Sequence, residues 1–408
     1  MLKKAALLII CLLAILTLTR AQNGLGDVIS YSEYGGNISI SPFKKCRDSP
    51  LPSPDNNRSS IPTYIINLDL PPEDRWKNVV TDYKPLILRF IETLRNNTDR
   101  IFGAEIFKWI DKYLPAIAKT LPKEYYRELL GISEITGVPV GEVTVFNVFY
   151  EFNSLCTSII VENKNGIMFH GRNLDFGFPF GWDVKNKTWL LTELLRPLVF
   201  KAEFQRNSET LYTAVQFAGY IGVLTGIRKN AFAMSVNERF KLDGGIIGII
   251  EWILGRRDQK WNGILTRELM ESSKTYEEAQ NILQTSFLIA PVYFILSGTK
   301  TGEGCVVTRG RNDVDIWRIS EQSANSSWYL VQTNYDHWKK PPFIDDRVVP
   351  SVICLELLGR SDPVYTLYNV LSTIPVLNKE TIFSSVMEPV TGDIKIWLQN
   401  CPDPCWPW

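Results

Sequence analysis

Cys156 is the residue of this sequence whose type and setting best suit covalent chemistry. A cysteine outside a disulfide is most often a small buried apolar side chain, so its surroundings decide the interpretation. Thr157–Val161 has the composition of a strand, and Asn163–Gly166 contains an Asn-Gly pair that favours a hairpin. The return strand brings Arg172–Asp175 back beside the cysteine. Because a neighbouring guanidinium favours the thiolate, the hairpin predicts a thiol nucleophile.

The register of this hairpin decides which residue lies opposite Cys156. A two-residue loop places Asp175 there, whereas a four-residue loop places Asn173 there. A carboxylate at this point can orient an ammonium group or an incoming amide. The alternative interpretation is an ordinary surface ion pair between Arg172 and Asp175, which has no chemical role.

A cysteine nucleophile needs a base, and histidine is the usual one. The chain has two histidines, His170 and His337. His170 follows the hairpin turn on the same strand as Arg172, and we expect it to be structural. If the chain were cut before Cys156, the new α-amine could serve as the base instead, since such amines titrate near about 8.

Two kinds of sequence pattern follow each other along the chain. Between Trp76 and about Ser154, apolar residues recur every three or four positions, which predicts helices. Beyond Cys156 the patterns of strands and helices alternate, which indicates an α+β protein. The strands expected there are 293–296, 305–308, 314–319 and 328–332, and the helices are 245–254, 275–283 and 364–371.

The first 21 residues have the pattern of a signal peptide. Lys3 and Lys4 precede the apolar run Ala5–Leu16, which is short for a membrane span, and small residues at Thr19 and Ala21 suit cleavage after Ala21. A membrane anchor is the alternative. Glycosylation sequons, which have meaning only in the secretory route, begin at Asn37, Asn57, Asn96, Asn186 and Asn325.

The charge and the remaining cysteines restrict the function further. Lys+Arg and Asp+Glu both number 44, and this balance argues against nucleic-acid binding. Cys401-Pro-Asp-Pro-Cys405 is a tight loop that predicts a local disulfide. A metal site is the weaker alternative, because the chain has two histidines and no second cysteine pair at matching spacing.

Eight segments of the chain together form a specific pattern: Asn153–Ile159, His170–Gly177, Gly222–Gly226, Asn237–Phe240, Gly248–Gly255, Val331–Trp338, Asp345–Arg347 and Cys401–Cys405. In these segments the chain resembles the family of acid ceramidase and N-acylethanolamine acid amidase. The resemblance covers nearly everything after about residue 40, and the tail at 401–405 and the segment 334–338 favour the ceramidase branch.

The resemblance implies an N-terminal-nucleophile αββα sandwich that cuts itself between Leu155 and Cys156. Removal of the signal peptide (1–21) and this cut would give a helical α chain (22–155) and a catalytic β chain (156–408), held together as a heterodimer. By resemblance, Cys156 is the nucleophile for both cleavages, and Asn334 supplies the oxyanion donor. Arg172 and Asp175 order the nucleophile and its amine, and Glu238 and Arg347 occupy supporting positions. The implied catalytic set is Cys156, Arg172, Asp175, Glu238, Asn334 and Arg347.

The same resemblance implies the covalent links, the substrate and the location. Cys46 would pair with Cys354 and Cys401 with Cys405, leaving Cys305 unpaired. No metal or organic cofactor is implied. The expected protein is a lysosomal, also secreted, enzyme that hydrolyses ceramide to sphingosine and a fatty acid at a membrane surface, with a saposin-type activator as helper.

Three other functions remain open from the sequence. The same chemistry could act on N-acylethanolamines, the fold could belong to an inactive lipid-binding relative, or the chain could be a cytosolic thiol hydrolase, which the signal peptide and sequons disfavour. A further hypothesis assigns Gly177–Trp182, with Phe178 and Phe180, to a lipid channel or membrane contact. Its alternative is ordinary core packing.

Overall fold

The computed structural model describes the chain from residue 43 onward, with interruptions. The described residues are 43–52, 61–102, 114–115, 118–149, 154–176, 181–239, 247–248, 251–252, 254–321 and 328–405.

The larger of the two main sheets has eight strands among the described residues. Its central strands are buried on both faces, so β10 reads as a continuous run without polar alternation. In spatial order the strands are β1 (Thr63–Asn67), β6 (Val199–Arg206), β7 (Glu209–Phe217), β8 (Thr225–Arg228), β9 (Phe232–Glu238), β10 (Val292–Ser297), β11 (Gly304–Arg309) and β12 (Val314–Arg318).

The smaller sheet has five strands in the described part of the chain. Its centre is the antiparallel hairpin predicted from the sequence, and a strand from much later in the chain pairs with the hairpin's second arm. In spatial order the strands are β13 (Tyr329–Gln332), β2 (Ser154–Glu162), β3 (Met168–Phe176), β14 (Thr381–Glu388) and β15 (Asp393–Leu398).

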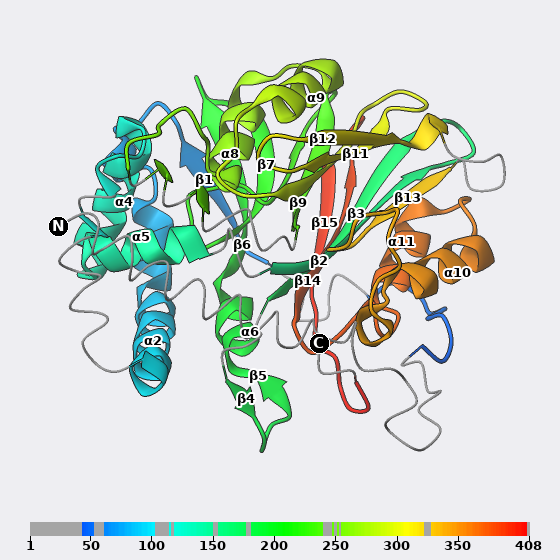
Figure 1. The fold of residues 1–408 in the computed structure, drawn as a ribbon, viewed down its shortest axis with the longest axis horizontal. Helices are drawn as coiled ribbons and strands as arrows, with labels where there is room; N and C mark the ends of the chain where they lie inside the picture. Colours follow the sequence, from blue (N-terminus) through cyan, green and yellow to red (C-terminus); the bar gives the residue numbers. More distant parts are fainter. Residues whose placement is uncertain are drawn as a thin grey trace.

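The two sheets pack face to face and are covered by helices on their outer faces (Figure 1). Strands β2 and β3 contact β9 and β10 of the larger sheet. Helices α8 (Asn262–Ser272) and α9 (Tyr276–Thr285) cover the larger sheet, while α10 (Val348–Leu358) and α11 (Pro363–Leu371) lie with the smaller one. This is the αββα sandwich, with α+β composition, that the resemblance implied.

Capping residues mark the ends of several helices. The Thr275 side chain accepts a hydrogen bond from the Glu278 N–H and caps α9, and Asp362 caps α11 just before a proline at the first helical position. Helix α4 (Lys123–Thr136) ends at Gly137, whose φ of 75° is the left-handed conformation that favours glycine.

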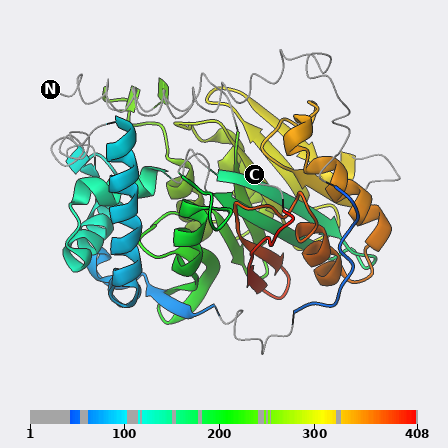
Figure 2. The ribbon, with the colours of Figure 1, turned by 90° about the horizontal axis from the view of Figure 1, so that it is seen from below.

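The residues before the hairpin form a helical layer at one end of the sandwich, with α2 (Lys77–Phe102), α4 and α5 (Val140–Phe149). The blue and cyan helices of this segment stand opposite the orange helices α10 and α11 (Figure 2). The helices predicted between Trp76 and about Ser154 correspond to these three wherever the structure describes that part of the chain. The segment is not purely helical, because β1 joins the larger sheet parallel to β6.

A buried ion pair joins this helical layer to the rest of the molecule. Arg267 of α8 pairs with Glu128 of α4, and both side chains are fully buried. The Trp76 indole N–H donates to the same carboxylate at 2.7 Å. Arg75 also lies 3.0 Å from Glu128, and Arg267 also lies 3.1 Å from Glu271, so the pair is part of a larger buried network of charges.

The remaining elements are short connections. They are the hairpin β4 (Trp182–Asp183) and β5 (Thr188–Trp189), helix α6 (Leu190–Leu195), and the 3-10 turns η2 (Pro72–Asp74), η3 (Arg196–Leu198), η4 (Ile319–Glu321) and η5 (Phe343–Asp345). Within the described residues, no single helix combines the length and apolar character that crossing a bilayer requires; α4 and α5 do so only as a pair bent by 120°.

The expected strands at 293–296, 305–308, 314–319 and 328–332 correspond to β10 to β13, and the expected helices at 275–283 and 364–371 to α9 and α11. Half of the predicted helix 245–254 lies outside the described residues, and its residues 247–248 and 251–252 are helical.

Candidate active site

The β2–β3 hairpin has a register that differs from both predictions by one residue. Cys156 pairs with Leu174, and Leu155 pairs with Asp175. The reason is the turn: the Asn163 side-chain oxygen accepts hydrogen bonds from the N–H groups of Asn165 (2.8 Å) and Ile167 (2.9 Å). This stabilises a connection from Asn163 to Ile167, longer than either loop considered from the sequence, with Gly166 at φ 78°.

Arg172 and Asp175 lie on opposite faces of the hairpin, because they stand three residues apart on β3. Residues that pair across strands share a face, so Cys156, Leu174 and Arg172 point between the two sheets. Asp175 and Asn173 point the other way, and the Asn173 amide donates to the main-chain oxygen of Leu371 in α11 at 2.8 Å. Both Arg172 and Asp175 are fully buried, so their interpretation as a surface ion pair is wrong.

Arg172 holds the sulfur of Cys156. Its Nη2 lies 3.0 Å from Sγ and donates to the Val236 main-chain oxygen at 2.7 Å. Its Nη1 donates to the Leu224 main-chain oxygen and to the Thr225 hydroxyl. These oxygen partners are uncharged, so the guanidinium presents its positive charge to the sulfur at a fixed distance, as a thiolate requires.

Asn334 and Arg347 hold the main chain of Cys156. The Cys156 N–H donates to Asn334 Oδ1 at 2.8 Å, and Arg347 Nη1 donates to the Cys156 carbonyl at 2.7 Å. Arg347 Nη2 also donates to Asn334 Oδ1, at 2.9 Å, so two donors fix the orientation of that amide. Asn334 Nδ2, the group needed for an oxyanion role, donates to the Glu238 main-chain oxygen at 2.9 Å.

Asp175 lies on the outer face among polar partners. Arg347 Nη1 is 3.5 Å from its Oδ2, and the Asn378 amide donates to the same oxygen at 3.2 Å. Burial raises the pKa of Asp175 to about 6, against the opposing effect of Arg347. Asp345 binds Arg347 through both of its carboxylate oxygens, at 2.8 and 3.1 Å, which further raises the pKa of that buried guanidinium against the effect of burial.

The two histidines have contacts that suit structural roles. His170 is fully buried, with Nε2 2.8 Å from the Ser235 hydroxyl and Nδ1 3.3 Å from Ser297. Burial, reinforced by the charge of Arg172, lowers the pKa of His170 to about 3, so the ring stays neutral. His337 stacks on Trp317 with ring centroids 4.4 Å apart. The structural role expected for His170 agrees with these contacts.

Three of the other five residues implied by resemblance contact Cys156 directly: Arg172, Asn334 and Arg347. Asp175 lies against Arg347, and Glu238 contributes its main-chain oxygen to Asn334. The sequence reasoning did not single out Asn378, Thr225 or Asp345 for a role. Asp345 stands two residues before Arg347, which is a usable signal. Asn378 and Thr225 have no such signal, because only the folded sheets bring them to the hairpin.

Sequence comparison places this site in a known family. Residues 156–352 match the sequence model for linear amide C–N hydrolases of the choloylglycine hydrolase family, and residues 59–121 match the model for the beta subunit of N-acylethanolamine-hydrolyzing acid amidase. Acid ceramidase of Homo sapiens is 43% identical over 367 residues, which span 89% of this chain and 92% of the human protein. The chain belongs to the acid ceramidase family.

Two further comparisons agree with this membership. Acid ceramidase of Mus musculus is 43% identical over 89% of this chain and 93% of its own length. The solved structure of a Caenorhabditis elegans ortholog of N-acylethanolamine-hydrolyzing acid amidase superimposes with a TM-score of 0.51 and 32% identity, covering 60% of this chain and 100% of that one. The part of the chain that matches the choloylglycine hydrolase family model begins at Cys156 itself.

The disulfides implied by the resemblance are present in this acid ceramidase family member. Cys46 is bonded to Cys354 and Cys401 to Cys405, while Cys156 and Cys305 are free and buried. Burial raises the pKa of the Cys305 thiol to about 11, which keeps it protonated and unreactive. Among the described residues, His, Cys, Asp and Glu side chains nowhere gather in a group of three suited to a metal ion.

The other sequence predictions fall partly outside the described residues. Asn96 on α2 and Asn186 in the β4–β5 turn are exposed, as a glycosylated asparagine must be. Asn37, Asn57 and Asn325, the signal peptide 1–21, and Phe178 and Phe180 of the proposed lipid contact lie outside the described part of the chain.

Proposed function

We propose that this protein is a ceramidase, which hydrolyses the amide bond of ceramide to sphingosine and a free fatty acid with Cys156 as its nucleophile. The observation that carries the proposal is that Cys156 is contacted at two atoms, its sulfur and its main-chain nitrogen. Arg172 lies 3.0 Å from the sulfur, while Asn334 accepts the main-chain N–H of the same residue at 2.8 Å. The 43% identity to acid ceramidases supplies the substrate.

The second part of the proposal is self-cleavage between Leu155 and Cys156, giving an α chain (22–155) and a β chain (156–408). The two matched family models support it, because they lie on either side of this bond, at residues 59–121 and 156–352. The sulfur of Cys156 attacks the Leu155 carbonyl carbon, the peptide C–N bond breaks, and water then hydrolyses the thioester. The Cys156 nitrogen, freed as an α-amine, remains next to Asn334 Oδ1.

Ceramide hydrolysis repeats this chemistry on an intermolecular amide. The Cys156 thiol gives its proton to the α-amine, and the thiolate, opposite Arg172, attacks the amide carbonyl. The amide C–N bond breaks, sphingosine leaves with the proton returned by the α-amine, and an acyl thioester remains. Water activated by the α-amine then cleaves the thioester and releases the fatty acid.

The remaining site residues have supporting roles in this proposal. Asn334 Nδ2 would leave the Glu238 oxygen to donate to the oxyanion, an interaction that is stronger in the transition state than in the ground state. Arg347 fixes Asn334, and Asp175 orients the α-amine from the outer face. Cys156 is fully buried in the uncut chain, so Sγ must become accessible before a lipid reaches it.

The proposed location is the lysosome, with some protein secreted. The signal-peptide pattern and sequons support entry to the secretory route, and two disulfides need an oxidising compartment to form. A membrane surface as the source of ceramide, and a saposin-type activator that presents it, complete the proposal on the strength of the family resemblance.

A second candidate substrate is an N-acylethanolamine. The observation that favours it is the match of residues 59–121 to a family model named for the N-acylethanolamine-hydrolyzing enzyme, together with the nematode ortholog's structure. Rates of hydrolysis of ceramide and palmitoylethanolamide, measured side by side on the processed protein, separate the two. A higher kcat/KM for palmitoylethanolamide would replace ceramide as the substrate.

The test of the nucleophile compares Cys156→Ala with Cys305→Ala, since both thiols are free and buried but one has no part in the site. After incubation at acidic pH, wild type and C305A are expected to yield a chain beginning Cys-Thr-Ser, seen by intact mass and N-terminal sequencing. C156A is expected to stay whole and inactive. A folded wild type that stays whole would favour the inactive lipid-binding relative.

Reduction supplies an independent check of the two-chain product. Cys46 and Cys354 fall on opposite sides of the proposed cut, so their disulfide must join the chains. On a denaturing gel, the processed protein is expected to run as one band without reductant and as two with it. Two bands in both conditions would contradict the proposed cut site or the linkage.

A further inference from the structure

The segment between β7 and β8, residues 218–224, is what places the acceptor of Arg172. It ends at Leu224, whose main-chain oxygen accepts from Arg172 Nη1 and also from the Val236 N–H at 3.0 Å. Thr225, the next residue, accepts from the same Nη1. Because Arg172 Nη2 lies 3.0 Å from the Cys156 sulfur, any rotation of this segment moves the guanidinium relative to the sulfur.

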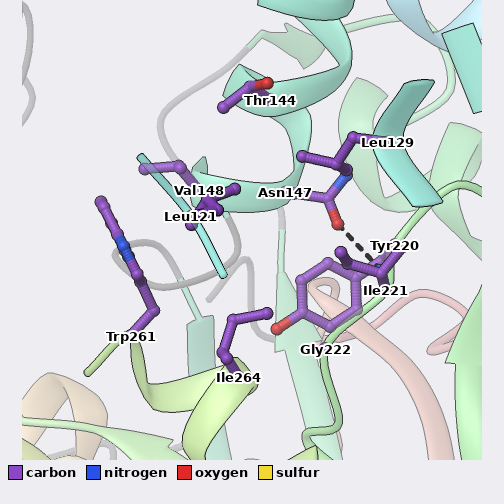
Figure 3. A pocket seen from close by; sticks show the side chains of 10 residues that line it. All are labelled: Leu121, Leu129, Thr144, Asn147, Val148, Tyr220, Ile221, Gly222, Trp261 and Ile264. Atoms are coloured by element: carbon purple, nitrogen blue, oxygen red, sulfur yellow. Dashed lines mark hydrogen bonds between the residues drawn. The ribbon is translucent and has the colours of Figure 1, made fainter. Parts of the chain in front are cut away.

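Asn147 of helix α5 holds the other end of this β7–β8 segment. Its Oδ1 accepts the Ile221 N–H at 2.8 Å, and its Nδ2 donates to the Gly219 main-chain oxygen at 2.9 Å. Nδ2 also donates to the Val143 oxygen one turn earlier, which locks the side chain to its own helix. Figure 3 shows Asn147 reaching from the helix to the Ile221 backbone.

The packing beside this contact leaves the segment little freedom. Gly219 has φ 94°, and a Cβ on it would lie 3.1 Å from the Phe146 ring, so α5 presses on the turn where it bends. The cavity that Asn147 borders, between α5 and α8 (Figure 3), measures about 20 Å³. That volume holds about one water molecule and no lipid chain, so the contact is a tight joint.

Arg267 of α8 and Gln216 of β7 also hold this segment. Arg267 donates to the Ile221 oxygen at 3.0 Å, and the Gln216 amide donates to the Gly222 oxygen at 2.8 Å. These donors belong to the part of the chain after Cys156. Asn147 differs from them because it precedes the proposed cut and satisfies a main-chain donor, the Ile221 N–H.

We propose that Asn147 is a positioning residue, through which the segment before the cut fixes Arg172 against the nucleophile. The path runs from Asn147 to the β7–β8 segment, from Leu224 and Thr225 to Arg172, and from Arg172 to the sulfur. The inference rests on the proposed function for its readout. Under this proposal, the α chain continues to position a catalytic residue after cleavage.

The test uses Asn147→Leu, which keeps the shape of the side chain and removes its hydrogen bonds. Its matched control is Thr144→Val on the same helix, because Thr144 lines the same cavity and bonds to its own helix through the Val140 oxygen. Each full-length protein is allowed to process itself, and kcat, KM and the pH dependence of kcat/KM are then measured with a short-chain ceramide, alongside the unfolding temperature.

Asn147→Leu is expected to lower kcat on the order of tenfold with KM within about twofold, since small displacements of a positioned charge mainly affect the reacting step. The acid limb of its kcat/KM profile should move to higher pH, because the thiolate has a less well placed counter-charge. T144V should stay within about twofold of wild type. If N147L does not fold, Asn147→Asp, which keeps an acceptor for the Ile221 N–H, takes its place with an expected loss of about threefold.

Two outcomes overturn the inference: an unchanged kcat and pH profile in the folded Asn147 variant, or an equal loss in T144V. Either would leave Asn147 with a packing role. A wild type that processes itself but hydrolyses no N-acyl lipid sinks the proposed substrate instead. The rate at which each precursor cuts itself then serves as the readout, because the same thiol and Arg172 perform that step.

Discussion

The two faces of the β2–β3 hairpin place different charged groups near Cys156. On the inner face, Arg172 brings its charge to the sulfur, and its described oxygen partners are carbonyls and a hydroxyl. On the outer face, Asp175 lies near Arg347, which is itself bound by Asp345. The inner face therefore carries a charge directed at sulfur, and the outer face a network of opposite charges.

This difference follows from the pleat of the strand and has a chemical use. Successive side chains of β3 alternate between the faces, so residues 172 and 175 cannot neutralise each other. The thiol side of the hairpin therefore carries a cation and the opposite side a carboxylate. This arrangement suits a cysteine whose own α-amine acts as the base. Predictions that perturb one face at a time test whether the separation matters.

The largest effect is expected on the inner face, from Arg172→Met. Loss of the charge next to the sulfur should lower kcat/KM for ceramide by about 1,000-fold, at the upper end of what one preorganised electrostatic contact provides. The matched control is Arg309→Met, because Arg309 is also buried but donates to the main-chain oxygens of Leu283 and Ser286, which are not part of the site. Similar activity losses in both folded variants would contradict the inner-face role.

A smaller effect is expected on the outer face, from Asp175→Asn. The isosteric amide removes the carboxylate that faces Arg347 while keeping the volume, and we expect about a 100-fold loss of kcat. Self-cleavage, followed by the appearance of the chain starting at Cys156, should slow in parallel. If D175N processes and turns over like wild type, the outer face has no part in the chemistry.

Asn378→Ala should have a milder effect on the same face. Asn378 donates to Asp175 Oδ2 at 3.2 Å, and its own Oδ1 accepts the Glu380 N–H at 2.8 Å. Without it, Asp175 loses one orienting bond, which predicts about a tenfold lower kcat and an unchanged KM. Steady-state kinetics of N378A decide this, and a loss as large as that of D175N would mean that the loop itself collapses.

The smallest effect concerns the pH dependence of the free energy of unfolding, to which His170 and Asp175 contribute with opposite signs. The pKa of His170 is lowered to about 3, so its contribution to stability is present above pH 6.5 and is lost as pH falls toward 3. The pKa of Asp175 is raised to about 6, so its contribution is present below about pH 4 and is lost as pH rises through 6. In wild type these slopes partly cancel between pH 4 and 6.5.

Single variants should expose each slope. Between pH 6.5 and 4.5, acidification is expected to raise the free energy of unfolding of His170→Gln relative to wild type by on the order of 1–2 kcal/mol. The same acidification is expected to lower that of D175N relative to wild type by a similar amount. Unfolding temperatures at three pH values in this range measure both. Parallel profiles for the two variants would show that neither group is linked to folding.

The sequence predicted the hairpin and its reactive residue because that information is local. The Asn-Gly turn and the run Thr157–Val161 lie within a few residues of each other, and the change of pattern at Cys156 marks where the helical layer gives way to the sandwich. The register was wrong because the Asn163 side chain, which accepts two N–H groups, lengthened the connection. Turn side chains of this kind compete with backbone pairing in ways that a dipeptide signal does not specify.

Distant pairings could not be predicted from periodicity. Strand β14 inserts beside β3 from about 200 residues away and carries Ser384 and Ser385 in a fully buried run. Such a run has no alternation to detect. The Ser384 hydroxyl donates to Asn173 across the pair and accepts from the Gln399 amide, and both partners are brought to it only by the fold. Strands β6 to β9 were not predicted either, although β6 alternates buried and partly exposed residues. Asn334 and Arg347 were named through family resemblance, since nothing local marks them.

The Cys46–Cys354 disulfide has a consequence for how the molecule persists once cut. In the intact chain it closes a ring of 308 residues that includes the Leu155–Cys156 bond. That ring restricts the unfolded chain by an entropy worth roughly 6 kcal/mol. The proposed cut opens the ring, so the disulfide becomes a tether between two pieces and the restriction disappears. Maturation therefore exchanges equilibrium stability for activity, and the lifetime of the mature enzyme depends on how slowly it unfolds.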